Sequence, residues 1–283
     1  MEAYVMDAFS AGIFGGNQAG VVLPDRQLSD ELMQQIAAEF KHSETAFVDC
    51  RSDGSVAVRY FTPAGEVELC GHATIATFAL LRQIGRIADG THTAHTKAGA
   101  LQIRVSGDTV WMDMAPPKLL RELPEETWDE LYAAYGLTPE NRPKDLIPKI
   151  VSTGLADILL PVDSHDTLMR AVQNAPAVTE LSRRYDVTGV HMFCLGDGAT
   201  YCSNYAPLYD IPEECATGTS NGALTYYLWL RGLIEEGAEN TFIQGEHMNR
   251  PSEIRSRLLV NNGEPAVLIG GRAVMSMRCQ LQI

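Results

Sequence analysis

The stretch VELCGHATIATF, residues 67–78, places a cysteine, a glycine and a histidine at the head of an otherwise apolar run. The run continues through ALLRQIG without a broad polar face, which predicts a helix that is buried on most sides and closed by Gly85. A second stretch, PEECATGTSNGAL at 212–224, leads into the apolar run TYYLWLRGL in the same way. Two buried helices with polar, glycine-containing starts are therefore the central feature of the predicted fold.

The surroundings of the two stretches match in register. Tyr60 lies ten residues before Cys70, and Tyr205 lies ten residues before Cys215. Each segment then passes a proline and carries two acidic residues before or beside the cysteine: Pro63, Glu66 and Glu68, then Pro207, Glu213 and Glu214. Several coincidences in one register favour a duplicated lobe.

Strand and helix patterns alternate on either side of these helices. Strands are expected at 3–9, 19–24, 45–50, 56–61, 149–162, 189–196 and 200–206, and two more around the Gly-Gly pair of the tail, 264–283. Helical spacing is found at 28–41, with Ser29 and Asp30 as capping candidates, and at 124–137 and 166–173. The pattern restarts near Pro116. It predicts an α+β protein with an N-terminal lobe, 1–115, to which a strand at about 270–283 can return, and a C-terminal lobe, 116–269.

Composition narrows the class of protein. The 283 residues carry a formal net charge of −14, which argues against nucleic acid or an anionic membrane as a partner. No apolar run approaches the roughly 20 residues of a membrane span, and the first residues lack a signal-peptide pattern. We expect a cytoplasmic protein with reduced thiols. The six cysteines form no Cys-x-x-Cys pair, so neither disulfides nor a metal site is expected.

The start of the first helix allows two interpretations. Free backbone N–H groups at a helix N-terminus bind carboxylates and stabilise a thiolate or an enolate. Gly71 would let a ligand approach the backbone, and His72 can exchange a proton near neutral pH. The alternative is a small buried Cys70 beside a histidine that caps its helix. The Cys215–Thr219 segment offers the same groups in the second lobe, or only good N-cap residues.

Glu44 presents a similar choice. It lies between a predicted helix and a predicted strand, in the segment KHSETAFV at 41–48. A glutamate in such a position is commonly a solvated loop residue. A carboxylate drawn into a cleft would have a raised pKa and could act as a general base.

Five separated motifs resemble the PhzF-like family of phenazine-biosynthesis isomerases. They are GGNQAGVV, SETAFV, RYFTPAGEVELCGHATIA, ECATGTSNGAL and QGEHMNRPSEI, in family order. The resemblance implies the diaminopimelate epimerase-like fold. In that fold two pseudo-symmetric lobes each form a curled, mostly antiparallel sheet or barrel around a central helix, and the active site lies between them.

The resemblance also implies roles for particular residues. The family's catalytic glutamate falls on Glu44, and His72 would bind substrate or assist the proton transfer. Residues expected to hold the substrate's carboxylate are Ser43, Gly71, Ala73, Gly218 and Thr219. Gln244, Gly245 and the segment 250–252 match a supporting motif. The reaction implied is a cofactor-independent proton shift on a small carboxylate-bearing substrate, in a possible homodimer.

Three positions depart from the family pattern. Glu214 stands where the family has aspartate, Cys215 where it has proline, and Gln18 where proline is common. Cys70 and Cys215 together resemble the paired acid and base of amino-acid racemases. A two-thiol racemase or epimerase is therefore the alternative enzyme, and Glu214, in place of the family's aspartate, is a further catalytic candidate. A non-catalytic small-molecule-binding protein on the same fold is the other alternative. No nucleotide-binding glycine pattern or lysine-centred cofactor motif is present, so no cofactor is expected.

Overall fold

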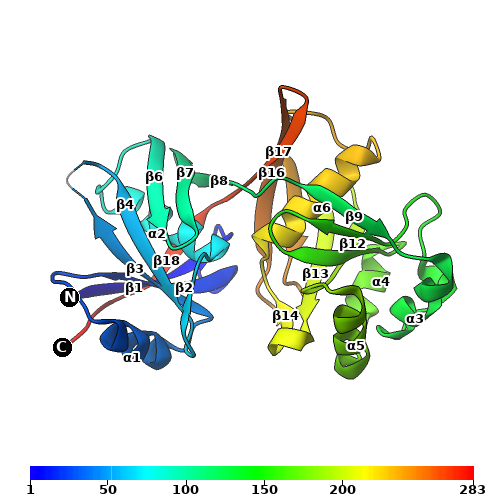
Figure 1. The fold of residues 1–283 in the computed structure, drawn as a ribbon, viewed down its shortest axis with the longest axis horizontal. Coiled ribbons are helices and arrows are strands. Elements are labelled where there is room, and N and C mark those ends of the chain that lie inside the picture. Colours follow the sequence, from blue (N-terminus) through cyan, green and yellow to red (C-terminus); the bar gives the residue numbers. More distant parts are fainter. Residues whose placement is uncertain (52) are drawn as a thin grey trace. The chain divides into compact units, whose positions relative to one another are not determined.

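The computed structural model describes residues 1–51 and 53–283, which form two compact units. The first unit comprises Met1–Asp113 and Gly270–Ile283, and the second comprises Met114–Ile269. Each unit is built around one buried helix, α2 (Gly71–Gln83) in the first and α6 (Gly218–Leu230) in the second (Figure 1). Among the described residues, none of the helices has both the length and the apolar character that a membrane crossing requires.

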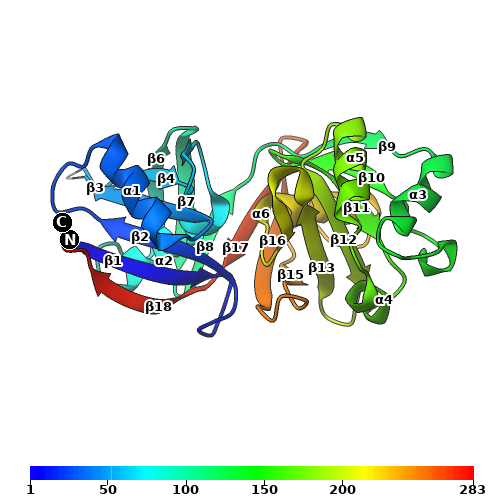
Figure 2. The same ribbon diagram turned by 90° about the horizontal axis from the view of Figure 1, so that it is seen from below.

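The first unit is a curled sheet that surrounds α2. The helix contacts strands from both halves of that sheet, including β1, β3, β8 and β18. The elements of this unit are β1 (Glu2–Ala8), β2 (Asn17–Leu23), α1 (Asp30–Phe40), β3 (Glu44–Cys50), β4 (Val56–Phe61), β5 (Glu66–Val67), α2, β6 (Gly90–Thr96), β7 (Gly99–Ser106), β8 (Thr109–Asp113) and β18 (Ala273–Gln280). The last strand lies beside β1, which brings Met1 and Leu281 into hydrogen-bond contact (Figure 2).

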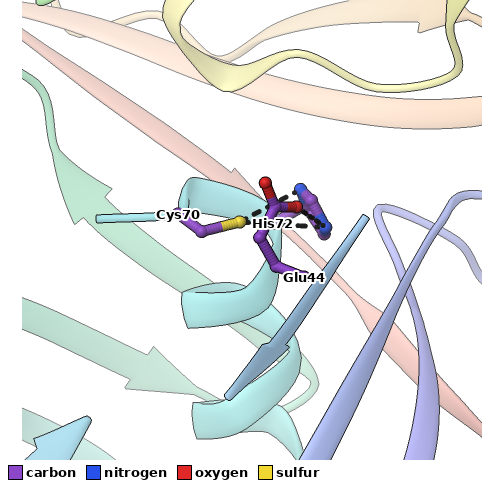
Figure 3. Close-up of side chains that lie close together, drawn as sticks. All are labelled: Glu44, Cys70 and His72. Atoms are coloured by element: carbon purple, nitrogen blue, oxygen red, sulfur yellow. Dashed lines mark hydrogen bonds and ion pairs between the residues drawn. The ribbon is translucent and has the colours of Figure 1, made fainter. Parts of the chain in front are cut away.

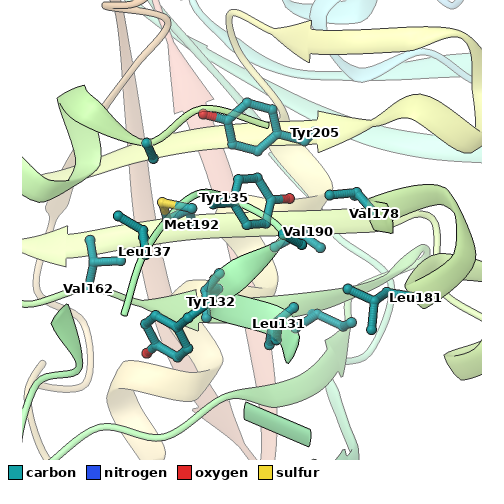
Figure 4. Close-up of a cluster of buried hydrophobic side chains, with 14 of the residues drawn as sticks. Leu131, Tyr132, Tyr135, Leu137, Val162, Val178, Leu181, Val190, Met192 and Tyr205 are labelled. Carbon is teal, nitrogen blue, oxygen red and sulfur yellow. The ribbon is translucent and has the colours of Figure 1, made fainter. Parts of the chain in front are cut away.

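The second unit repeats this plan with larger insertions. Its strands are β9 (Lys118–Glu122), β10 (Lys149–Ser152), β11 (Ala156–Pro161), β12 (Gly189–Leu195), β13 (Thr200–Ala206), β14 (Ile211–Glu214), β15 (Asn240–Gln244), β16 (Ser252–Asn261) and β17 (Glu264–Gly271). Its helices are α3 (Trp128–Ala133), α4 (His165–Arg170), α5 (Ala175–Tyr185) and α6, with short 3₁₀ turns at Glu125–Thr127, Pro139–Asn141 and Pro207–Tyr209. The additional helices α3 and α5 cover a separate core of leucine, valine and tyrosine side chains (Figure 4).

Strand pairing confirms the predicted duplication. In the first unit β1–β2 and β3–β4 are antiparallel, whereas β2–β3 and β4–β6 are parallel. In the second unit β10–β11 and β12–β13 are antiparallel, whereas β11–β12 and β13–β15 are parallel. The first repeat is counted from β1 and the second from β10. In each repeat the central helix follows the fifth strand, β5 or β14. The α+β class with two pseudo-symmetric units is therefore the observed fold.

The central helices are buried as their composition predicts. Every residue from His72 to Leu81 is buried in α2, and in α6 the buried stretch from Ser220 to Leu228 is interrupted only by Tyr226. Gly85 follows α2 with φ +72°, the left-handed conformation expected after a helix end. Ser29 caps α1 by accepting a hydrogen bond from the backbone N–H of Leu32, as its position predicts.

Several segments differ from the sequence-based expectations, and strands β7, β8, β9, β15 and β16 were not among the expected ones. The single strand expected at 149–162 is two strands, because Thr153–Leu155 turns the chain and Gly154 takes φ +132° there. Helix α5 was not predicted. The start of this helix could have been predicted from the sequence, because Asn174 caps it and Pro176 lies in its first turn.

Candidate active site

Three polar side chains meet at the first turn of α2, in the first unit. Cys70 is the N-cap, with extended backbone angles, and its carbonyl accepts the first helical hydrogen bond, from the N–H of Thr74 at 3.0 Å. His72 follows in the first turn, and Glu44 opens strand β3. Figure 3 shows the side chains of Glu44, Cys70 and His72 converging there. The sequence has Cys70 and His72 in one motif and Glu44 in another, and the fold brings the three side chains together.

His72 is the centre of this group. Its Nδ1 lies 3.4 Å from the Cys70 sulfur and 3.4 Å from Nδ2 of Asn17. Its Nε2 lies 3.3 Å from the hydroxyl oxygen of Ser43 and 3.3 Å from Oε2 of Glu44. The imidazole therefore contacts residues from three separate segments of the chain, which fixes its position above the helix start.

Burial lowers the pKa of His72, although Glu44 and a hydrogen bond with the backbone of Gln18 act in the opposite direction. Desolvation is the larger effect, because the side chain is only 6% exposed. The neutral imidazole is therefore the form favoured at neutral pH. A neutral imidazole can both donate and accept a hydrogen bond, which suits it to a relay between a carboxylate and a ligand.

One carboxylate oxygen of Glu44, Oε2, has unusual surroundings. The side chain is 20% exposed, but Oε2 is buried and accepts no hydrogen bond in the part of the chain that the structure describes. The 3.3 Å contact with His72 is within ion-pair range, yet it is not a hydrogen bond. A buried carboxylate oxygen without a donor costs about 1–3 kcal/mol, so its presence calls for a reason beyond folding.

The second helix start differs in detail from the first. Thr217 is the N-cap of α6, and Cys215 lies three residues before the first helical residue. Cys70 and Cys215 therefore do not hold the same position relative to their helices, although they match in the sequence register. Burial, followed by the negative charge of Glu214, raises the pKa of the Cys215 thiol to about 11. This thiol is therefore poorly ionised at neutral pH.

The Gln244 side chain forms hydrogen bonds with the residues that precede α6. Its amide nitrogen donates to the backbone carbonyl of Glu214 at 2.7 Å, and its oxygen accepts from the N–H of Thr217 at 3.2 Å. The same oxygen accepts from the Asn221 amide at 2.8 Å. The neighbouring Gly245 has φ +86°, and a Cβ there would lie 2.8 Å from the carbonyl oxygen of Cys215. The QGEHMNRPSEI motif thus supports the helix start directly.

The other residues proposed from the sequence are placed as follows. The Glu214 carboxylate accepts a hydrogen bond from the hydroxyl of Thr217 at 2.5 Å. The side chain of Ala73 is fully buried, which leaves only its backbone to meet a ligand, and the Thr219 carbonyl accepts from the Thr153 hydroxyl. Asn17 was not among the predicted site residues. Its place as the asparagine of the GGN turn, within a family motif, was the available signal.

The glycines at the two helix starts leave open space. Neither has a positive φ, and a Cβ on Gly71 would make only an ordinary contact, 3.8 Å from the sulfur of Met112. A Cβ on Gly218 would lie 3.6 Å from Cγ2 of Ile269. The protein's own packing and backbone therefore do not require glycine at either position, whereas Gly245 is required by both.

A family model described as phenazine biosynthesis-like protein, PhzC-PhzF, matches residues 6–279. The chain is 35% identical to an uncharacterized isomerase of Deinococcus radiodurans, over 92% of this chain and 88% of that protein. It is 31% identical to an uncharacterized isomerase of Pseudomonas aeruginosa, over 96% and 98% of the two chains. The crystal structure of a PhzF-family phenazine biosynthesis protein from Bacillus anthracis matches with a TM-score of 0.90 at 25% identity, covering 100% of this chain and 99% of that one.

A hydroxyproline epimerase from Agrobacterium vitis shares the fold, with a TM-score of 0.61 at 15% identity over 99% of this chain and 90% of that one. The relatives that are named isomerases, which match nearly the whole chain, define the protein as an isomerase. The chain belongs to the PhzC-PhzF family of phenazine biosynthesis-like proteins.

Proposed function

We propose that this isomerase moves a proton on a small carboxylate-bearing substrate, with Glu44 as the acid and base and with no organic cofactor. The observation that carries the proposal is the buried Oε2 of Glu44, which lies 3.3 Å from the Nε2 of His72 and accepts no hydrogen bond within the described chain. An acid–base carboxylate needs a free lone pair directed at the proton that it removes.

The position of Glu44 is compatible with a role in proton transfer. The carboxylate stands at the first residue of β3, and the parallel pairing of Ala19 with Glu44 anchors the backbone there. The remaining exposure of the side chain, 20%, leaves a path for a substrate. Burial lowers the pKa of His72, so the neutral imidazole beside Glu44 adds no fixed positive charge to the site. Glu44 can therefore take up a proton and release it to another carbon.

The start of α2 supplies the stabilisation that such a reaction requires. A C–H beside a carboxylate or a carbonyl is very weakly acidic, so charge that develops on the substrate oxygens must be balanced. The first N–H groups of α2 lack helical partners, and Gly71 places no side chain beside them. Preorganised backbone donors of this kind contribute a large part of the rate in many enzymes.

A two-thiol racemase is the second candidate. The observation that favours it is the 3.4 Å contact between the Cys70 sulfur and Nδ1 of His72, a pairing that can produce a thiolate. The pKa of Cys215, raised to about 11, weighs against a second thiol acid–base group at neutral pH. We therefore favour Glu44 as the proton carrier.

The test is deuterium wash-in followed by NMR. The reduced protein is incubated in heavy water with amino acids and with cyclic or unsaturated amino-carboxylates. Double-bond migration in an unsaturated acid that Glu44→Gln abolishes supports the proposal. Label at the α-carbon of an ordinary amino acid, with loss of optical purity, would assign the protein to the racemase class if Cys215→Ser abolishes that exchange and Glu44→Gln leaves it unchanged.

A further inference from the structure

We propose that Glu44, Cys70 and His72 form a binding site for a thiophilic divalent cation such as Zn²⁺, which blocks the site when it binds. One carboxylate oxygen, one thiol sulfur and one imidazole nitrogen lie within 4.8 Å of one another. Sulfur, imidazole nitrogen and carboxylate oxygen are the three ligand types that zinc binds in proteins. The binding is a property of these side chains and does not depend on the proposed reaction.

The distances between the ligand atoms fit a tetrahedral ion. With Zn–N and Zn–O near 2.0–2.1 Å and Zn–S near 2.3 Å, the tetrahedral edges are about 3.3 Å for N···O and about 3.6 Å for N···S. Nε2 of His72 lies 3.3 Å from Oε2 of Glu44 and 3.8 Å from Sγ of Cys70. The third edge, S···O, is within 4.8 Å, and rotation within the Glu44 side chain can shorten it. Oε2 breaks no hydrogen bond of the described chain in doing so.

Charge and the surrounding residues also favour a divalent cation at this site. A thiolate and a carboxylate balance the two positive charges of the ion, while the imidazole binds in its neutral form. Metal-bound histidines usually donate their second nitrogen to a fixed acceptor, and here the imidazole hydrogen-bonds with the backbone of Gln18. Three protein ligands leave a fourth position open for water or for a substrate carboxylate.

Bound zinc would inhibit the isomerase. Coordination occupies the lone pair of Glu44 that the proposed reaction needs, and it fixes His72 as well. Mg²⁺ prefers oxygen ligands in octahedral geometry, so it is not expected to bind or inhibit here. The inhibition rests on the proposed function, whereas the binding can be measured without any substrate.

The experiment uses the full-length, reduced and chelator-treated protein, titrated with Co²⁺ and then with Zn²⁺. We expect one equivalent of Co²⁺ to give a thiolate-to-metal charge-transfer band in the near ultraviolet and strong visible bands typical of tetrahedral cobalt, both removed by Zn²⁺. Cys70→Ser is expected to lose the charge-transfer band. Glu44→Gln should weaken Zn²⁺ binding at least about tenfold, since even an outer-shell partner contributes 10–100-fold.

The control is Cys50→Ser, which removes an exposed thiol from the same unit and should leave the spectrum unchanged. Circular dichroism of each variant verifies that it is folded. Absence of the charge-transfer band in the native protein, or its persistence in Cys70→Ser, would overturn the metal site. If Co²⁺ and Zn²⁺ bind as expected but no compound undergoes proton exchange, the metal site stands and the proposed reaction fails.

Discussion

Glu44 of the first unit and Thr188 of the second occupy equivalent positions in the two repeats. Ala46 pairs with Tyr60 across β3 and β4, and Val190 pairs with Tyr205 across β12 and β13. Glu44 and Thr188 each lie two residues before the paired strand residue. The duplicated scaffold therefore does not require a carboxylate at this position. An acidic residue found in only one of two matching repeats is better explained by chemistry than by folding.

The first prediction concerns Glu44→Gln. The substitution keeps the size of the side chain and removes its ability to accept a proton. We expect deuterium exchange to fall by about 10²–10⁴-fold, the usual contribution of a general acid–base group. Thermal stability should be unchanged or slightly higher, because Oε2 is buried without a hydrogen-bond donor from the described chain.

The matched control for this prediction is Glu68→Gln, two residues before Cys70 on the exposed surface of the same unit. It removes the same charge without touching His72. Equal losses of exchange in the two variants would show that the effect comes from the general field of negative charge rather than from Glu44. Full activity in Glu44→Gln would refute the proposed role of this residue outright.

Gly71→Ala separates binding from folding. Because φ is not positive and the new Cβ would make only a 3.8 Å contact, the free energy of unfolding should change by less than about 0.5 kcal/mol. The added methyl group would stand between a ligand and the first N–H groups of α2. We expect kcat/KM to fall by about 10²-fold, the lower range for losing one backbone donor to an oxyanion.

Gly65→Ala is the control for Gly71→Ala, since a Cβ at Gly65 has no atom of the described chain within 4 Å and φ there is not positive either. Steady-state kinetics and urea unfolding of both variants make the comparison. Unchanged kinetics in Gly71→Ala would show that the start of α2 does not hold the substrate.

The two cysteines should respond differently to substitution by serine. Cys70 contacts His72, so Cys70→Ser alters the surroundings of the imidazole, and we expect a clear loss of exchange. Cys215 has a pKa raised to about 11 and lies three residues before α6, so Cys215→Ser should cost less than about tenfold, or 1.4 kcal/mol of barrier. Exchange rates of the two variants on one substrate test this order, and the reverse order would favour the racemase.

Sequence reasoning identified the duplication because its signals are local. The equal spacing from Tyr60 to Cys70 and from Tyr205 to Cys215 corresponds in the structure to matching strand pairs, each followed by a buried helix. The position of Cys215 relative to α6 was not predictable in this way, because a distant residue helps to set it. Gln244 fixes Glu214 and Thr217 from about thirty residues away in the chain, and a local pattern does not show such a contact.

The same limit applies to the candidate site. Glu44 and His72 could each be selected from a motif, but their 3.3 Å contact depends on β3 lying beside the start of α2. Asn17 was missed because an asparagine after a glycine pair is first of all a turn residue. Its second role, against the imidazole of His72, requires that β2 and α2 pack together.

Gln244→Ala tests how the second helix start is supported. The side chain is fully buried and makes hydrogen bonds to Glu214, Thr217 and Asn221, so its loss removes several hydrogen bonds at the start of α6. We expect a loss of about 2–4 kcal/mol in the free energy of unfolding, since each unsatisfied buried group costs about 1–3 kcal/mol. Gln102→Ala, on an exposed strand position, should change it by less than about 0.5 kcal/mol. Equal urea midpoints for the two variants would contradict the structural role of Gln244.

The stability of the protein should decline in mild acid because of His191. This imidazole is fully buried beside Asn204, and burial lowers its pKa from 6.5 to about 3. Between these two values the unfolded chain binds a proton that the folded chain does not, so stability falls as the pH is lowered through this window. At pH 5 the cost from His191 alone is about 2 kcal/mol. Asp157, whose pKa is raised by burial, acts in the opposite sense, because acid relieves its buried charge.

His191→Gln isolates the contribution of this histidine, since glutamine does not titrate and all other groups remain. We expect the loss of unfolding free energy between pH 7 and pH 5, measured by urea denaturation, to be about 2 kcal/mol smaller in this variant than in the native protein. His95→Gln, at a partly exposed position of β6, is the matched control for replacing a histidine by glutamine. Parallel pH profiles for native protein and His191→Gln would mean that His191 does not exclude its proton in the folded state.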